Sequence, residues 1–299
     1  MNVIWQRESD HLWNVGVWPS GAGSDCTTLP GTSPQVKQNE PTCAFDPVTK
    51  KDERQAFYNS MKAGNRFSAA HTGGDKDIDY LLELIEQASK DAGMTPDEVR
   101  AKRHAYDHLA LSPRPDQIPR IKNLGMMLGG WDMYVWEGRA QDVLKNYGEE
   151  AAQWVVPRKN IFNAGVRQST EIDRPLGYTD LTFFSVMYAG ITRKDQNGKI
   201  NAPTQAISRE LELKSTTLSG AYYAFREDKN GSLKLGKFAD LIVLDRDYLT
   251  IPVDDIPKIR VLMTVLGGKV VHLVPSLAKE IGMQPTGSQV TLGGPAAQW

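Results

Sequence analysis

Three side chains in this sequence are of types that bind metals, and all three stand at the same position relative to the predicted strands. His71, His108 and Asp173 each stand at the end of a segment that reads as a parallel strand. In parallel α/β folds, the carboxyl ends of the strands and the loops after them form the face on which chemistry takes place. Two imidazoles and a carboxylate on one face suit zinc or a similar divalent metal. The carboxylate could also accept a proton from a water that the metal acidifies.

The elements that must position these residues alternate between strand and helix. Strands are predicted over residues 66–71, 101–108, 124–130 and 166–173. Helices are predicted over residues 52–63, 77–92, 113–123 and 140–163, the last interrupted near Pro157. A repeat of strand, polar loop and helix is typical of a parallel sheet with right-handed crossovers. The sequence therefore predicts an α/β fold.

The pattern changes in the last third of the chain. A helix is predicted over 204–225, and the alternating stretches 241–247 and 261–274, the second with a Gly-Gly turn, predict a small antiparallel unit. The proline- and glycine-rich segment 275–299 is expected to be a flexible tail. Residues 1–49 read as an irregular opening, either a functional lid or the remainder of structure whose other half lies elsewhere.

Composition narrows the class of protein. The 299 residues are 40% hydrophobic and 24% charged, as in globular proteins. Lys+Arg 35 against Asp+Glu 36 leaves no basic field for nucleic acid, and a mean hydropathy of −0.43 with no long apolar run predicts no membrane span. No secretory signal peptide is recognised, so the compartment stays open: cytoplasmic, or exported if a further N-terminal segment exists. Cys26 and Cys43 form either one bridge or two free thiols.

The C-terminal third carries a resemblance. The segment 231–272 is similar to the C-terminal signature of the amidohydrolase superfamily, in the branch called amidohydrolase family 3. The matching positions are Gly231, Gly236, Lys237, Ala239, Asp240 and Asp245. Further motifs of the family resemble AAHTGGD (69–75), YDHLALSPRPDQIPRIKNLGMM (106–127) and NAGVRQSTEIDRP (163–175). The resemblance implies a partial (β/α)8 TIM-type barrel within residues 1–230 and β-sandwich strands over 231–274.

The same motifs imply roles for individual residues. They align His71 and His108 with metal-binding histidines of the fifth and sixth barrel strands, with Asp107 in place of a glutamate. Asp173 aligns with the catalytic aspartate of the eighth strand, as metal ligand and general base. Glu171 is a rival two residues earlier, but the spacing from Val166 favours Asp173.

The chain departs from the family in one large respect. The family's H-x-H pair on the first strand is missing, and no bridging residue of the fourth strand can be placed. Residues 66–230 hold 165 positions, fewer than the roughly 250 of a full barrel. The sequence thus looks like the C-terminal portion of such an enzyme, and we expect at most one weakly held metal. A complementing N-terminal half or a homo-oligomer would supply the rest.

Two further residues are candidates for substrate contact. Arg174 could bind a substrate carboxylate or pair with Glu171. His104 lies four residues before His108 and so on the same side of a strand, where it would contact substrate or begin the strand as a polar residue.

Three functional hypotheses remain. The first is a zinc-dependent hydrolase of a C–N bond in a small amide, N-acyl or cyclic amide compound, with Asp173 as the base. The second is an inactive or partner-dependent half that needs another chain for the missing ligands. The third is a ligand-binding surface built from tryptophans. These are Trp5, Trp13, Trp18 and Trp131. None of the three involves nucleic acid or membrane.

Overall fold

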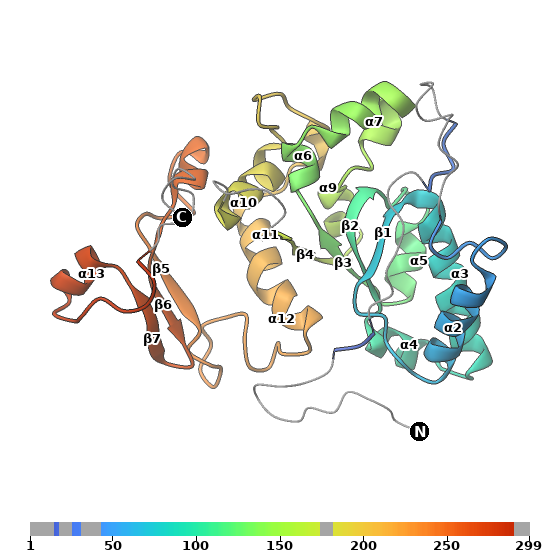
Figure 1. Ribbon diagram of the computed structural model, residues 1–299, viewed down its shortest axis with the longest axis horizontal. Helices are drawn as coiled ribbons and strands as arrows, with labels where there is room; N and C mark the ends of the chain where they lie inside the picture. Colours follow the sequence, from blue (N-terminus) through green and yellow to red (C-terminus); the bar gives the residue numbers. More distant parts are fainter. Residues whose placement is uncertain (1–14, 18–25, 31–42, 174–181, 290–299) are drawn as a thin grey trace.

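A computed structural model describes residues 15–17, 26–30, 43–173 and 182–289 (Figure 1). A four-stranded parallel sheet occupies the larger part, and a three-stranded antiparallel sheet lies to one side of it (Figure 1). The parallel strands are adjacent in chain order: β1 Ala70–Gly74, β2 Ala105–Leu111, β3 Met127–Gly130 and β4 Arg167–Thr170. The predicted α/β fold is confirmed, with four parallel strands among the described residues that are compatible with part of a (β/α)8 barrel.

Helices connect and cover these strands as the alternating pattern predicts. They are α2 Lys51–Lys62, α3 Asp75–Asp91, α4 Pro96–Lys102, α5 Ile118–Asn123, α6 Met133–Trp136, α7 Arg139–Tyr147, α8 Glu149–Ala152 and α9 Arg158–Asn163. The helix α3 shows why they form, because its apolar residues recur at helical spacing and are buried in the main core. These residues are Ile78, Leu81, Leu82, Ile85 and Ala88. Each fully buried Leu or Ile side chain stabilises the folded state by about 1.5–3 kcal/mol relative to an exposed one.

After β4 the chain forms a broken helical segment rather than the one helix predicted over 204–225. Its parts are α10 Phe183–Thr192, η1 Pro203–Gln205, α11 Arg209–Lys214, the π-turn η2 Ser215–Ser219 and α12 Gly220–Tyr223. Ser208 caps α11 by accepting a hydrogen bond from the N–H of Leu211. The π-turn places Ser215 against β4, where its Oγ donates to the carbonyl of Gln168 at 2.9 Å.

The antiparallel unit is confirmed, and it is attached through α10. It comprises β5 Leu241–Leu244, η3 Val253–Lys258, β6 Val261–Leu266, β7 Lys269–Leu273 and α13 Pro275–Glu280. Tyr188 of α10 packs with Ile256 of η3 in a shared apolar cluster. The expected flexible tail is wrong for residues 275–289, because Pro275 opens α13 and Leu273 pairs with Thr286. Among the described residues, no helix is long and apolar enough to cross a bilayer.

Short segments of the opening cover the outer edge of the parallel sheet. Val17 pairs with Phe67, and Cys26 and Cys43 form a disulfide, which settles the alternative left open by the sequence. The Cys26 carbonyl accepts from the N–H of Lys76 and lies against Gly74 at the end of β1. Most of β1 is buried, although Val17 and Val48 of the opening are exposed; several other exposed apolar side chains lie farther along the chain. They include Leu233, Leu235, Ile242 and Leu266, in and before the antiparallel sheet.

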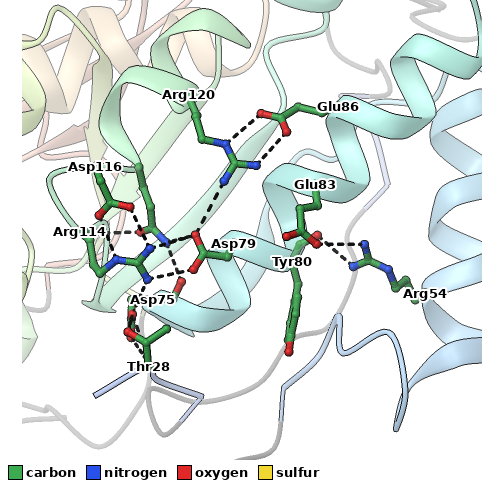
Figure 2. A network of polar contacts seen from close by, with 11 residues as sticks. Thr28, Arg54, Asp75, Asp79, Tyr80, Glu83, Glu86, Arg114, Asp116 and Arg120 are labelled. Atoms are coloured by element: carbon green, nitrogen blue, oxygen red, sulfur yellow. Dashed lines mark hydrogen bonds and ion pairs between the residues drawn. The ribbon is translucent and has the colours of Figure 1, made fainter. Parts of the chain in front are cut away.

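A network of ion pairs fixes the start of α3 at the carboxyl end of β1 (Figure 2). The buried carboxylate of Asp75 accepts from the Nη1 of Arg114 at 2.6 Å and from the backbone N–H of Thr28 at 3.2 Å. Arg114 also binds Asp79 and Asp116. The network thus joins the loop after β2 to the opening segment and to α3.

Substituting Arg114→Gln should lower the free energy of unfolding by about 3 kcal/mol, because it leaves the buried Asp75 charge without its cation. The matched control is Arg100→Gln, whose pair with Asp97 is exposed on both sides and should matter by less than about 1 kcal/mol. Urea unfolding measures both. Equal losses in the two variants would contradict the assigned role of Asp75.

His104, at the amino end of β2, is a buried structural residue. Its Nδ1 accepts from the backbone N–H of Phe67 at 3.1 Å, and its side chain is 2% exposed. Burial, together with the charges of Arg66 and Lys102, lowers the pKa of His104 to about 3. The ring is therefore neutral in the folded protein at neutral pH.

This lowered pKa predicts an acid-sensitive contribution to stability. The unfolded chain takes up a proton at His104 near pH 6.5 and the folded chain only near pH 3, so stability that is present above pH 6.5 is lost as the pH falls through that window. His104→Asn keeps an acceptor for Phe67 but cannot titrate. At pH 4.5 the part of the loss due to His104 should be about 3 kcal/mol. Urea unfolding at pH 7 and pH 4.5 should show a smaller loss of unfolding free energy in the variant than in the parent protein. Equal losses in the two proteins would contradict this role of His104.

Candidate metal centre

The pairing of β1 with β2 brings His71 and His108 together. The strands run in parallel with His71 opposite Asp107 and Thr72 opposite His108. The two imidazole rings are nearly perpendicular, at 87°, and their Nε2 atoms lie 3.1 Å apart. The convergence predicted for these two histidines is thus present in the structure.

The backbone at His108 is unusual. His108 and Leu109 have φ values of 72° and 58°, in the left-handed region that residues other than glycine seldom adopt. The β1–β2 register also shifts between Thr72 and Gly74. Such irregularities cluster at functional sites, where they re-aim a side chain. At His108 the local backbone, and not simple strand alternation, sets the direction of the ring.

Glu171 holds His108 from the far side of β3. It follows β4 directly, and its Oε2 lies 2.8 Å from the Nδ1 of His108. Its Oε1 accepts from the backbone N–H of His108 at 3.3 Å. The carboxylate passes over Gly129 of β3, where a Cβ would come within 1.8 Å of Oε1. Only a glycine at position 129 leaves room for this contact.

Negatively charged side chains around His108 stabilise the protonated form of its ring. Burial lowers the pKa of His108, but the hydrogen bond to Glu171 and the charges of Glu171, Asp107 and Asp173 outweigh it, so the pKa is raised overall. Burial raises the pKa of Glu171, partly opposed by its hydrogen bond to His108. The negative side chains around His108 therefore favour a cation at this point.

The donor atoms fit a divalent metal. Glu171, 2.8 Å from the Nδ1 of His108, orients that ring from behind, and Asp107 lies 3.4 Å from the Nδ1 of His71. Either one ring donates its Nε2–H to the Nε2 of the other, or both Nε2 lone pairs face a shared cation. Two nitrogens bound tetrahedrally to zinc at 2.0–2.1 Å are about 3.3 Å apart, close to the distance seen here. One ligand atom each from His71, Asp107 and His108 lies within 4.8 Å of the others.

Not every predicted site residue joins this pair. Asp173 lies just beyond β4, is exposed, and has a left-handed φ of 43°. Its charge contributes to raising the pKa of His108, and its role as ligand and base stays a prediction. Arg174 lies outside the described residues. His104 is apart from the site, immediately before β2, where its Nδ1 accepts a hydrogen bond from the N–H of Phe67.

Two carboxylates at the site were not among the expected ligands. The sequence spacing favours Asp173 over Glu171, and the family resemblance gives Asp107 only as a replacement for a glutamate. The signal that could have found Glu171 is the Gly129-Gly130 pair of β3, since small residues on a central strand mark the close approach of another group.

Aromatic side chains pack beside the pair. The ring of Trp131 lies 5.5 Å from that of His108 and 4.6 Å from that of Tyr134. Trp131 is 8% exposed, so it packs against the histidine as a wall and presents little surface of its own. The other tryptophans of the ligand-surface hypothesis, Trp5, Trp13 and Trp18, lie outside the described residues.

Comparison with known proteins places these features in a family. A sequence model described as the amidohydrolase family matches residues 43–272. The curated N-substituted formamide deformylase of Arthrobacter pascens is 26% identical over 206 residues, which cover 67% of this chain and 35% of that protein.

Solved structures show a similar fold. An uncharacterized metal-dependent hydrolase from Pyrococcus furiosus matches 81% of this chain and 46% of its own length, with a TM-score of 0.61 and 23% identity. A second from Pyrococcus horikoshii matches 82% and 47%, with a TM-score of 0.61 and 22% identity. This chain thus spans about a third of the deformylase and less than half of either solved structure. Since the family match covers most of the chain and includes His71, His108 and Glu171, this chain belongs to the amidohydrolase family.

Proposed function

We propose that this chain carries metal-binding and catalytic residues of a hydrolase that cleaves the C–N bond of a small amide. The observation that supports this most is the pair of facing Nε2 atoms, 3.1 Å apart, on His71 and His108, with Glu171 and Asp107 behind the rings. Such an arrangement orients imidazoles for a metal. The similarity to a protein named N-substituted formamide deformylase favours an N-substituted amide as the substrate.

In this proposal His71 and His108 hold a divalent ion, most simply zinc, with Asp173 as a third ligand. The ion would polarise the amide carbonyl and acidify water at the site. In this proposal Glu171 accepts from the Nδ1–H of His108, so that the Nε2 of His108 is free to donate its lone pair; Asp107 lies 3.4 Å from the Nδ1 of His71.

In this proposal Asp173 transfers a proton from the attacking water to the leaving nitrogen. Hydrolysis breaks the amide C–N bond, adds a hydroxyl to the acyl carbon and delivers a proton to the leaving nitrogen. The exposed carboxylate of Asp173, just beyond β4, would take the proton from the attacking water and return it to that nitrogen. The wall formed by Trp131 and Tyr134 would limit access of bulk water to His108.

A second candidate function is a partner-dependent half of such an enzyme. It is favoured by the small set of candidate ligands, since His71, Asp107 and His108 form the one histidine-containing group among the described residues that could hold a metal. In that case a separate chain would supply further ligands and strands, and this chain alone would bind metal weakly.

Substituting His108→Ala should remove zinc from the purified protein, because one of the two facing imidazoles is lost. We expect at most one zinc per chain in the parent protein, and a loss of at least 10-fold in zinc affinity in the variant, with little change in the far-UV circular dichroism. The matched control is His272→Ala, in β7 of the separate sheet. Competition with a chromophoric chelator measures the affinity, and unchanged affinity in the His108 variant would exclude this site.

Asp173→Asn should lower kcat for amide hydrolysis by about 100-fold or more, because the base is lost. The assay supplies a panel of N-alkyl and N-aryl formamides to the zinc-loaded chain and measures formate. Asp142→Asn, on the exposed side of α7, serves as the control. Full activity in the Asp173 variant would contradict its assignment. If the zinc-loaded parent releases formate from none of the amides, the partner-dependent function is the better one.

A further inference from the structure

A second polar cluster, separate from the residues of the proposed metal centre, lies at the carboxyl ends of β3 and β4. Its centre is Arg158, the first residue of α9, whose guanidinium is completely buried. Asp132 and Glu212 flank it, and both of these carboxylates are also completely buried. A buried charged group costs several kcal/mol to desolvate, and a well-packed apolar replacement is often no less stable. A contribution to folding stability therefore does not by itself explain why these three charged side chains are buried together.

The contacts of Arg158 converge on the carboxyl ends of the two strands. Its Nη2 donates to the Oγ1 of Thr170, the last residue of β4, at 3.0 Å, and reaches the carbonyl of Gly130, the last residue of β3, at 3.5 Å. Its Nη1 donates to the Oγ of Ser215 at 2.9 Å. One guanidinium therefore ties the ends of both strands to the π-turn η2.

The two carboxylates keep the guanidinium in this place. Asp132 accepts from Nε and Nη2 of Arg158, and Glu212 accepts from the Oγ1 of Thr170 at 2.7 Å. Burial would lower the pKa of Arg158, but the charges of Asp132 and Glu212 outweigh it and raise the pKa overall. Thr170 is thus held from two sides, as acceptor from Arg158 and as donor to Glu212.

The tied strand ends lead directly to Glu171. Glu171 follows Thr170 in the chain, and its backbone N–H donates at 3.0 Å to the same Gly130 carbonyl that Arg158 reaches. From this fixed backbone the side chain of Glu171 crosses Gly129 to the Nδ1 of His108. A small shift of β4 relative to β3 would therefore move the carboxylate away from His108.

We propose that Arg158 is a positioning residue of the metal centre: by clamping the ends of β3 and β4 it fixes Glu171, and through Glu171 it fixes the ring and tautomer of His108. The inference rests on the proposed function only in treating His108 as a metal ligand. The position of the ring itself is a property of the metal-free chain.

The test uses Thr170→Val, which removes the hydroxyl between Arg158 and Glu212 while keeping the shape of the side chain. Thr192→Val is the matched control, because its hydroxyl bonds a helix carbonyl, that of Tyr188, on α10. Arg158→Lys is a second variant that keeps the charge but loses the forked geometry. Thermal unfolding reports the effect of each variant on stability.

Two readouts go beyond stability. The first is the tautomer of His108 in zinc-free protein, read from imidazole nitrogen shifts in a sample with labelled histidine. The chain has five histidines, and comparison with His108→Asn assigns the signal. The second is the affinity for Co²⁺ alone, measured by its visible absorption.

We expect Thr170→Val to convert His108 from one Nδ1–H tautomer to a mixture and to weaken Co²⁺ binding about 10-fold, with Arg158→Lys acting in the same direction. Thr192→Val should leave both readouts at the parent values. If Thr170→Val and Arg158→Lys lower the melting temperature but change neither readout, Arg158 is only structural and the proposal is overturned. If Arg158→Lys does not fold, Thr170→Val decides. If the parent protein binds no Co²⁺, the metal proposal fails, while the tautomer still tests the role of Arg158.

Discussion

The contact between the carboxylate of Glu171 and the Nδ1 of His108 is the constraint on which the site depends. It crosses an entire strand, so it requires β2, β3 and β4 to lie in chain order with fixed spacing. It also determines which ring nitrogen of His108 points toward His71. The helices and the core below the sheet can be understood as the support that keeps these three strand ends in register.

Much of the fold follows from local pattern. The four parallel strands and the antiparallel unit were predictable because apolar alternation, glycine turns and the stripe of α3 all favour the same elements. His71 and His108 were predictable as partners because they stand on neighbouring parallel strands, although β1 and β2 both continue past them, to Gly74 and Leu111. Family motifs added the likeness that the family match then confirmed.

The features of the fold and of the site that could not be predicted depend on contacts between segments distant in sequence. Glu171 is separated from His108 by 63 residues, and the left-handed backbone at His108 has no local signature in the sequence. His104 has the spacing of a site residue, yet a hydrogen bond from Phe67 fixes it at the wrong end of β2. The disulfide between Cys26 and Cys43 likewise depends on how the opening segment lies along β1.

The bare backbone of Gly129 has an evolutionary meaning. A side chain at position 129 and a carboxylate at position 171 exclude one another, since both would occupy the same volume above β3. A lineage that gains a residue larger than glycine at 129 must therefore give up the glutamate, and with it this means of orienting the histidine on β2. We therefore expect positions 129 and 171 to change together among relatives of this chain.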